Sequence, residues 1–239
     1  MLMPSPSAML DIWETGQDAA PWVRAMLLLR AAEPDLADDA HENLSIGERD
    51  ARLIDLRALI FGCTLSSLAR CPGCGAQLEL SFSTHDLQVS RPVTDHFRVE
   101  HGDWIITCRL PTSADFRALA FDPQAAHALL LACIDRVERD GSPATAEALT
   151  ADALAQVAAA MAEADPRADL SAAMACPDCG ANWSARFDIV AYLWEELGNW
   201  ARKLLCDIHV LASNYGWREA DVLALSPQRR KYYVGLVRT

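Results

Sequence analysis

The stretches "CPGCGAQLELSF" (71–82) and "CPDCGANWSARF" (176–187) repeat one pattern at two distant places in the chain. Each begins with Cys-Pro-x-Cys-Gly-Ala and continues into alternating residues that predict a strand. Two residues between paired cysteines let both thiolates reach one tetrahedral ion, and the following glycine accepts the left-handed conformation that such a turn requires. We therefore expect the two stretches to be the halves of one zinc ribbon.

The expected ligands of this zinc ion are the four paired cysteines, Cys71, Cys74, Cys176 and Cys179. Four thiolates leave no position for water or substrate, so the Zn²⁺ is expected to be structural. A redox pair is the alternative, but it needs a cysteine of low pKa, usually at a helix N-terminus after a strand, and neither pair has that setting. The remaining cysteines stand singly in apolar surroundings and are expected to be buried: Cys63, Cys108, Cys133 and Cys206.

Composition limits the function classes. The 239 residues carry a formal net charge of −12, which argues against a general nucleic-acid binder and favours protein partners. The N-terminus has no secretory pattern, Pro4 and Pro6 are expected to break any helix there, and the apolar run 25–29 is too short to span a bilayer. We expect a cytoplasmic protein without a membrane segment.

The fold class expected from these patterns is α+β and mostly helical, with a split zinc ribbon, a helical insertion and a C-terminal helical segment. Helices are expected at 21–32 and at 45–62, the second capped by Ser45, with an acidic loop at 33–43 between them. Residues 97–110 predict a hairpin that turns at 101–103, and residues 123–140 predict one of the insertion helices. Gly216 is expected to end the long C-terminal helix. The expected divisions are an N-terminal helical region (1–70), the first ribbon half with a β-hairpin (71–111), an insertion of three helices (112–169), the second ribbon half (170–190) and a long helix with two short ones (191–239).

No catalytic constellation is found in the sequence. Metalloprotease, nucleophile-elbow and phosphate-loop motifs are all absent. Glu195 and Glu196 are neighbours on an expected helix, where adjacent side chains diverge by about 100°, so a solvated face is expected rather than an acid–base pair. We expect neither enzyme activity nor a small-molecule substrate.

The C-terminal segment combines aromatic and basic residues, which are typical anchors of protein interfaces. The residues expected to bind a partner are Tyr215, Trp217, Arg229, Arg230, Tyr232 and Tyr233. The alternative is a zinc-ribbon regulator whose two short C-terminal helices bind DNA. Apolar residues interrupt the basic set, which makes nucleic acid the weaker interpretation.

The phrase "IHVLASNYGWREADVLALSPQRRKYYVGLV" (208–237) resembles the closing motif of the baseplate hub assembly chaperones of T-even-type phages and of related contractile injection systems. Four further phrases are similar to zinc-ribbon proteins from gene clusters for phage-tail-like particles, namely "LDIWETGQ" (10–17), "IGERDARLIDLR" (46–57), "LPTSADF" (110–116) and "CPDCGANWSARFDIVAYLWEEL" (176–197), as is the first cysteine stretch. The resemblance implies a non-enzymatic role in building a contractile baseplate, with baseplate or hub proteins as partners. It leaves open whether the protein is a transient chaperone or stays in the particle.

Overall fold

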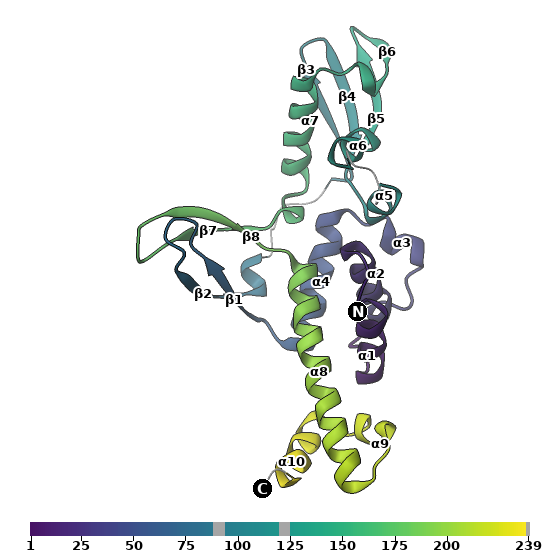
Figure 1. Ribbon diagram of the computed structural model, residues 1–239. Coiled ribbons are helices and arrows are strands. Elements are labelled where there is room, and N and C mark those ends of the chain that lie inside the picture. The colour runs from purple at the N-terminus through teal and green to yellow at the C-terminus, as the bar shows by residue number, and fades with distance from the viewer. Residues whose placement is uncertain (88–93, 120–124, 238–239) are drawn as a thin grey trace.

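A central helical body carries three projecting parts in the computed structural model, which describes residues 1–87, 94–119 and 125–237 (Figure 1). The parts are a two-hairpin arm, an upper lobe that combines a sheet with helices, and a C-terminal lobe of helices. The mixed and mostly helical fold class predicted from the sequence is confirmed.

The body consists of the N-terminal half of α8 and four helices that precede it in the chain. Their bounds are α1 (Pro6–Thr15), α2 (Pro21–Ala32), α3 (Asp38–Glu42), α4 (Ile46–Phe61) and α8 (Ile189–Tyr215). Leucines from α2, α4 and α8 form the main core, among them Leu29, Leu53, Leu56 and Leu193, each fully buried. Burial of this apolar surface holds α1, α2 and α4 against α8.

Two expectations about the body are wrong. Pro6 does not prevent a helix, because it occupies the first turn of α1, where its missing N–H costs no hydrogen bond and Ser5 caps the helix. The acidic stretch 33–43 contains the short helix α3, held through ion pairs from Arg30 to Asp38 and Glu42 at 3.1 and 3.0 Å.

The upper lobe is one antiparallel sheet with a helix packed on it. The strand order is β3-β4-β5-β6, with bounds β3 (His96–His101), β4 (Trp104–Arg109), β5 (Ile134–Arg139) and β6 (Ser142–Ala144). Helix α7 (Ala151–Ala164) contributes Val157 to the core that this sheet forms around Ile106 and Val137. The short helices α5 (Ser113–Ala118) and α6 (Ala125–Ala132) connect β4 to β5.

The predicted hairpin around residues 101–103 is confirmed, but the insertion is not wholly helical. The sequence predicted a helix that runs to residue 140, whereas residues 134–139 form strand β5. Strand β5 pairs with β4 along its length and places Val137 in the core, so tertiary pairing outweighs the helical spacing of the preceding alanines and leucines. Residues 120–124, also predicted to be helical in part, lie outside the described residues.

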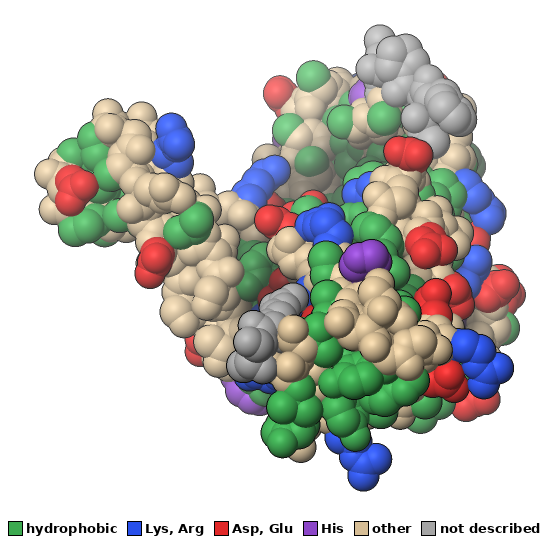
Figure 2. Space-filling view, turned by 60° about the horizontal axis from the view of Figure 1, so that its bottom comes forward, with side chains coloured by type: hydrophobic (Ala, Val, Ile, Leu, Met, Phe, Trp, Pro, Cys, Tyr) green, Lys and Arg blue, Asp and Glu red, His purple; other side chains and the backbone are tan. Residues whose placement is uncertain are grey.

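Two separate hairpins form the arm that extends sideways from the body (Figure 1). Their strands are β1 (Thr64–Arg70), β2 (Gln77–Ser83), β7 (Ser171–Ala175) and β8 (Asn182–Arg186). Strands β2 and β8 were predicted, and β1 was not. Figure 2 shows the same arm standing away from the rest of the molecule. Single turns of 3₁₀ helix lie at Thr84–Leu87, Ala146–Ala148 and Pro166–Ala168.

The C-terminal lobe forms where α8 continues beyond the body. Gly216, at φ +68°, ends α8 as predicted, and α9 (Glu219–Leu223) and α10 (Pro227–Val237) fold back onto it. Leu204, Leu211, Val222 and Val234 form its core. Across the three described ranges of the chain, no helix is both long and apolar enough to cross a membrane.

Candidate metal centre and C-terminal surface

The tips of the two arm hairpins have the same backbone structure. At residues 71–76 the N–H of Cys71 donates to the carbonyl of Ala76 at 2.8 Å, and the N–H of Gly75 donates to the carbonyl of Cys71 at 2.9 Å. Residues 176–181 repeat both bonds at 2.9 Å. The glycine of each tip has a positive φ, +77° at Gly75 and +73° in the second tip, so a side chain there would strain the turn.

These tips bring the four predicted ligands into one cluster. The Sγ atoms of Cys71, Cys74, Cys176 and Cys179 all lie within 4.8 Å of one another. The Sγ atoms of Cys71 and Cys179 are 3.6 Å apart, as are those of Cys74 and Cys176, so each short distance joins one hairpin to the other. A zinc–sulfur bond of about 2.3 Å implies Sγ–Sγ distances near 3.8 Å around a tetrahedral ion, whereas a disulfide is about 2.05 Å long. The donor set therefore fits a four-thiolate metal site and not a disulfide.

Backbone amides prepare part of this cluster for a cation. The N–H of Cys74 donates to Cys71 Sγ, as does that of Gly73 at 3.4 Å, and these bonds lower the pKa of Cys71 to about 7. The N–H of Ala76 favours the thiolate of Cys74, but the neighbouring thiols of Cys179 and Cys176 outweigh it and raise the pKa of Cys74 to about 12. One thiolate thus forms readily, whereas several adjacent thiolates need a bound positive charge.

The single cysteines divide into two kinds. Cys108 and Cys133 are buried as predicted, and burial raises their pKa to about 12 and about 11. Cys63 and Cys206 are exposed, so the prediction that they are buried is wrong. Cys63 lies between α4 and the arm, and Cys206 lies on the outer face of α8.

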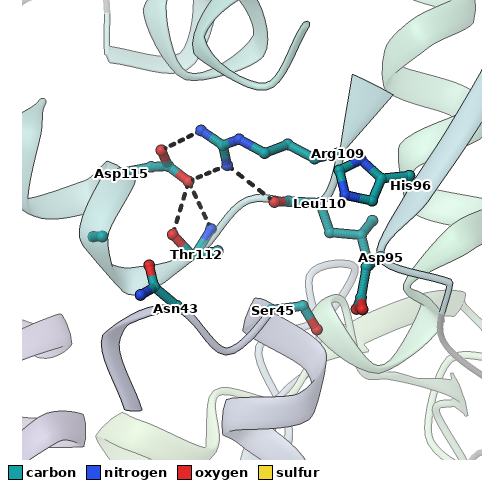
Figure 3. A pocket seen from close by; sticks show the side chains of 9 residues that line it. Asn43, Ser45, Asp95, His96, Arg109, Leu110, Thr112 and Asp115 are labelled. Carbon is teal, nitrogen blue, oxygen red and sulfur yellow. Dashed lines mark hydrogen bonds and ion pairs between the residues drawn. The ribbon is translucent and has the colours of Figure 1, made fainter. Parts of the chain in front are cut away.

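A hollow of about 450 Å³ lies where the upper lobe meets the body (Figure 3). Arg109 donates to both carboxylate oxygens of Asp115 at 2.7 Å, and Asp115 also accepts from the N–H and hydroxyl of Thr112 (Figure 3). Ser45 and Thr112 form an isolated β-bridge beside this network. Arg109 and Asp115 satisfy each other within the upper lobe. The lobe is joined to the body here by the backbone, through this bridge and through the N–H of Ile46, which donates to the carbonyl of Pro111 at 3.1 Å.

The four aromatic residues among the predicted partner residues meet at one corner of the C-terminal lobe, where the rings of Tyr215 and Trp217 stack with centroids 4.9 Å apart. Tyr233 lies edge-on to Trp217 at 5.2 Å, and Tyr232 projects beyond it with 67% of its surface exposed. Arg229 is also exposed, but Arg230 is not part of this surface. It is buried beneath α8, with Nε 3.7 Å from a carboxylate oxygen of Asp207.

Several residues that fix the arm and the lobes were missed in the sequence. Glu196 was expected on a solvated face, but it pairs with the buried Arg57 at 2.7 Å. The hydroxyl of Tyr192 donates to the carbonyl of Ser66 at 2.9 Å and accepts from its N–H at 3.0 Å, which attaches the arm to α8. Contacts between residues so distant in sequence leave no local pattern from which they can be predicted. The one local indication was Arg57 itself, a single arginine on an apolar helix face.

Comparison with known proteins identifies the family. A family model described as T4 bacteriophage base plate protein matches residues 31–191, which include both cysteine pairs, the upper lobe and the first turn of α8. The C-terminal phrase at 208–237, which resembles the hub assembly chaperones, lies outside the match. No curated protein and no solved structure matches the chain. Because the family match spans more than half of its length, the chain belongs to the T4 bacteriophage base plate protein family.

Proposed function

We propose that this protein is a non-enzymatic structural or assembly protein, of the chaperone-like kind, in the baseplate of a contractile phage-tail-like particle. The observation that carries the proposal is the baseplate family match over residues 31–191. Membership implies interaction with other baseplate proteins. In this proposal the protein is cytoplasmic and acts in the particle while the particle is assembled.

In this proposal a zinc ion cross-links the two hairpins. The four cysteines would fill its coordination shell, so the ion would have no free position for water or substrate. Structural zinc contributes on the order of 10 kcal/mol of apparent binding free energy, which becomes folding free energy when the ligands are far apart in the chain. The zinc ion would hold together the arm, because its two described sheets, β1-β2 and β7-β8, do not pair with each other.

The partner surface in this proposal is the exposed aromatic corner of the C-terminal lobe. Tyr215 and Tyr232 are large and exposed, and Trp217 is partly buried between Tyr215 and Tyr233. The exposed Arg229 lies one helical turn before Tyr232 and Tyr233 on α10. Aromatic and arginine side chains concentrate binding energy in protein interfaces. The resemblance of residues 208–237 to hub assembly chaperones supports the same assignment.

The nucleic-acid interpretation has less support than it had from the sequence. Arg230, one of its three clustered cations, is buried and faces Asp207. The chain as a whole carries a net charge of −12, which repels phosphates. A protein partner therefore explains the lobe better.

Deletion and complementation test the proposal. We expect a strain that lacks the gene to form no intact sheathed particles in electron micrographs, and wild-type protein to restore them. A double variant, Arg229→Ala with Tyr232→Ala, should fold normally but restore few particles, whereas Arg136→Ala on the distant strand β5 should restore them fully. Intact, functional particles from the deletion strain would disprove the role, and mass spectrometry of purified particles separates a permanent component from a transient chaperone.

A further inference from the structure

A groove separate from the aromatic corner lies between α8 and α10 in the C-terminal lobe. Its volume is about 520 Å³, within the range of roughly 300–1,000 Å³ typical of binding pockets. The residues that matter for its chemistry are Trp200, Lys203, Asp207, Arg230, Lys231 and Gly235. Figure 2 turns this end of the molecule toward the viewer and shows hydrophobic side chains gathered there beside Lys and Arg.

The groove is positively charged within a strongly acidic chain. Lys203 and Lys231 are exposed at its rim, and Arg230 lies in its wall. Among the described residues that line the groove, Asp207 is the one acidic residue. Because the whole chain has a net charge of −12, this local excess of positive charge is not a consequence of overall composition. It selects for an anionic ligand.

Arg230 has unused hydrogen-bonding capacity. Its side chain is only 8% exposed, and its Nε lies 3.7 Å from Asp207, beyond ordinary hydrogen-bond distance. Its Nη1 is buried and has no hydrogen-bond partner among the described residues. A buried guanidinium normally has its donors satisfied, so an additional acceptor would stabilise this wall of the groove.

The remaining lining is apolar and leaves room for a side chain. Trp200, Leu204 and Val234 supply hydrocarbon and aromatic surface. At Gly235 an added Cβ would meet nothing within 4 Å, so the α10 side of the groove is open. A ligand that fits must combine carboxylates with apolar side chains.

We propose that this groove binds an acidic amphipathic segment of a baseplate partner, with its carboxylates on Lys203, Lys231 and Arg230 and its apolar side chains against Trp200 and Val234. The proposal rests on the proposed function, because it names the kind of partner that the C-terminal lobe accepts. Charge complementarity and the open apolar wall together select this occupant.

A purified-component titration tests the groove independently of particle assembly. The probe is a short fluorescein-labelled peptide with glutamates and leucines at helical spacing and blocked ends, and its counterpart carries glutamine in place of glutamate. Fluorescence anisotropy with the full-length protein should show saturable binding of the glutamate peptide and at least about tenfold weaker binding of the glutamine peptide. Equal affinity for the two peptides, or no saturable binding, overturns the proposal whether or not the protein is needed for particles.

Two matched pairs of variants locate the binding. Lys203→Glu with Lys231→Glu should weaken binding about tenfold, whereas Arg98→Glu with Arg136→Glu, on exposed strands of the upper lobe, changes the net charge equally and should leave it unchanged. Gly235→Leu should block the groove, whereas Gln228→Leu adds the same side chain to an exposed position of α10 outside it. Equal losses within either pair contradict a site in the groove, and thermal melts confirm that each variant is folded.

Discussion

Arg57 on α4 and Glu196 on α8 form a two-bond ion pair although they are 139 residues apart. Arg57 Nε and Nη2 donate to the two carboxylate oxygens at 2.8 and 2.7 Å, and Nη1 donates to the carbonyl of Gly62 at 2.6 Å. The arginine side chain is only 3% exposed. This pair joins α4, which precedes the first hairpin, to α8, which follows the second. It therefore fixes the two places where the arm is connected to the helical body.

Removal of Glu196 should destabilise the protein strongly. Glu196→Ala leaves the guanidinium of Arg57 buried without its counter-charge, and a buried pair broken on one side costs about 3–5 kcal/mol. The partly exposed carboxylate places the expected loss near the lower value, about 3 kcal/mol. Urea unfolding measures it, with Glu195→Ala on the exposed face of α8 as the control within about 0.5 kcal/mol of wild type. Equal midpoints for the two variants would show that the pair contributes little.

Gly47 should not tolerate a side chain, because its Cα packs directly against a buried carboxylate. The N–H of Gly47 donates to Asp165 Oδ2 at 2.8 Å, and an added Cβ would collide with Asp165 Oδ1. Gly47→Ala should lower the free energy of unfolding by about 1–3 kcal/mol, since the added methyl group displaces the Asp165 carboxylate from the N–H of Gly47. Gly235→Ala, with open space around the Cβ, should instead stabilise α10 by up to about 1 kcal/mol. Thermal melts that shift in the same direction for both alanines would refute this contrast.

Asp50 should make the protein less stable as pH rises from about 4 to 6. Burial raises its pKa from 3.8 to about 6; Arg49 opposes this shift, whereas Asp188 and Asp165 add to it. The folded state therefore binds the proton more tightly than the unfolded state, so protonated Asp50 favours folding and that stability is lost as pH rises through the folded pKa. The shift corresponds to roughly 2–3 kcal/mol.

The pH dependence is measured by comparison with Asp50→Asn. The difference in unfolding free energy, variant minus wild type, should increase by roughly 2–3 kcal/mol between pH 4 and pH 7. The comparison removes contributions that both proteins share, such as protonation of the cysteines. A difference that stays constant over this range would mean that Asp50 has an ordinary pKa.

The metal ligands could be predicted because their signal is local. The spacing within each pair and the glycine after it determine a tip, and the similar strands behind both pairs indicate that they belong together. The structure brings the same four cysteines within 4.8 Å. Helix limits with a capping residue and a stop glycine were also predicted correctly, as at Ser45 and Gly216.

What could not be predicted depends on distant partners. Strand β5 follows α6 with a single residue between them, and its pairing with β4 is not visible in "IDRVER" alone. Strand β1 is similarly held by β2 and by Tyr192, which is 126 residues away from Ser66. Burial of Arg230 follows from how α10 folds back onto α8, which the alternation of basic and aromatic residues does not specify.

Metal content of the purified full-length protein tests the central claim most directly, namely that the two hairpins form one unit held by a structural metal. Native mass spectrometry should show one zinc ion per chain. Cys176→Ser should lose both the zinc and the cooperative thermal transition, whereas Cys206→Ser, an exposed cysteine outside the cluster, should keep both. A wild-type chain that is folded and metal-free, or a Cys176→Ser variant that melts at the wild-type temperature, would contradict the account.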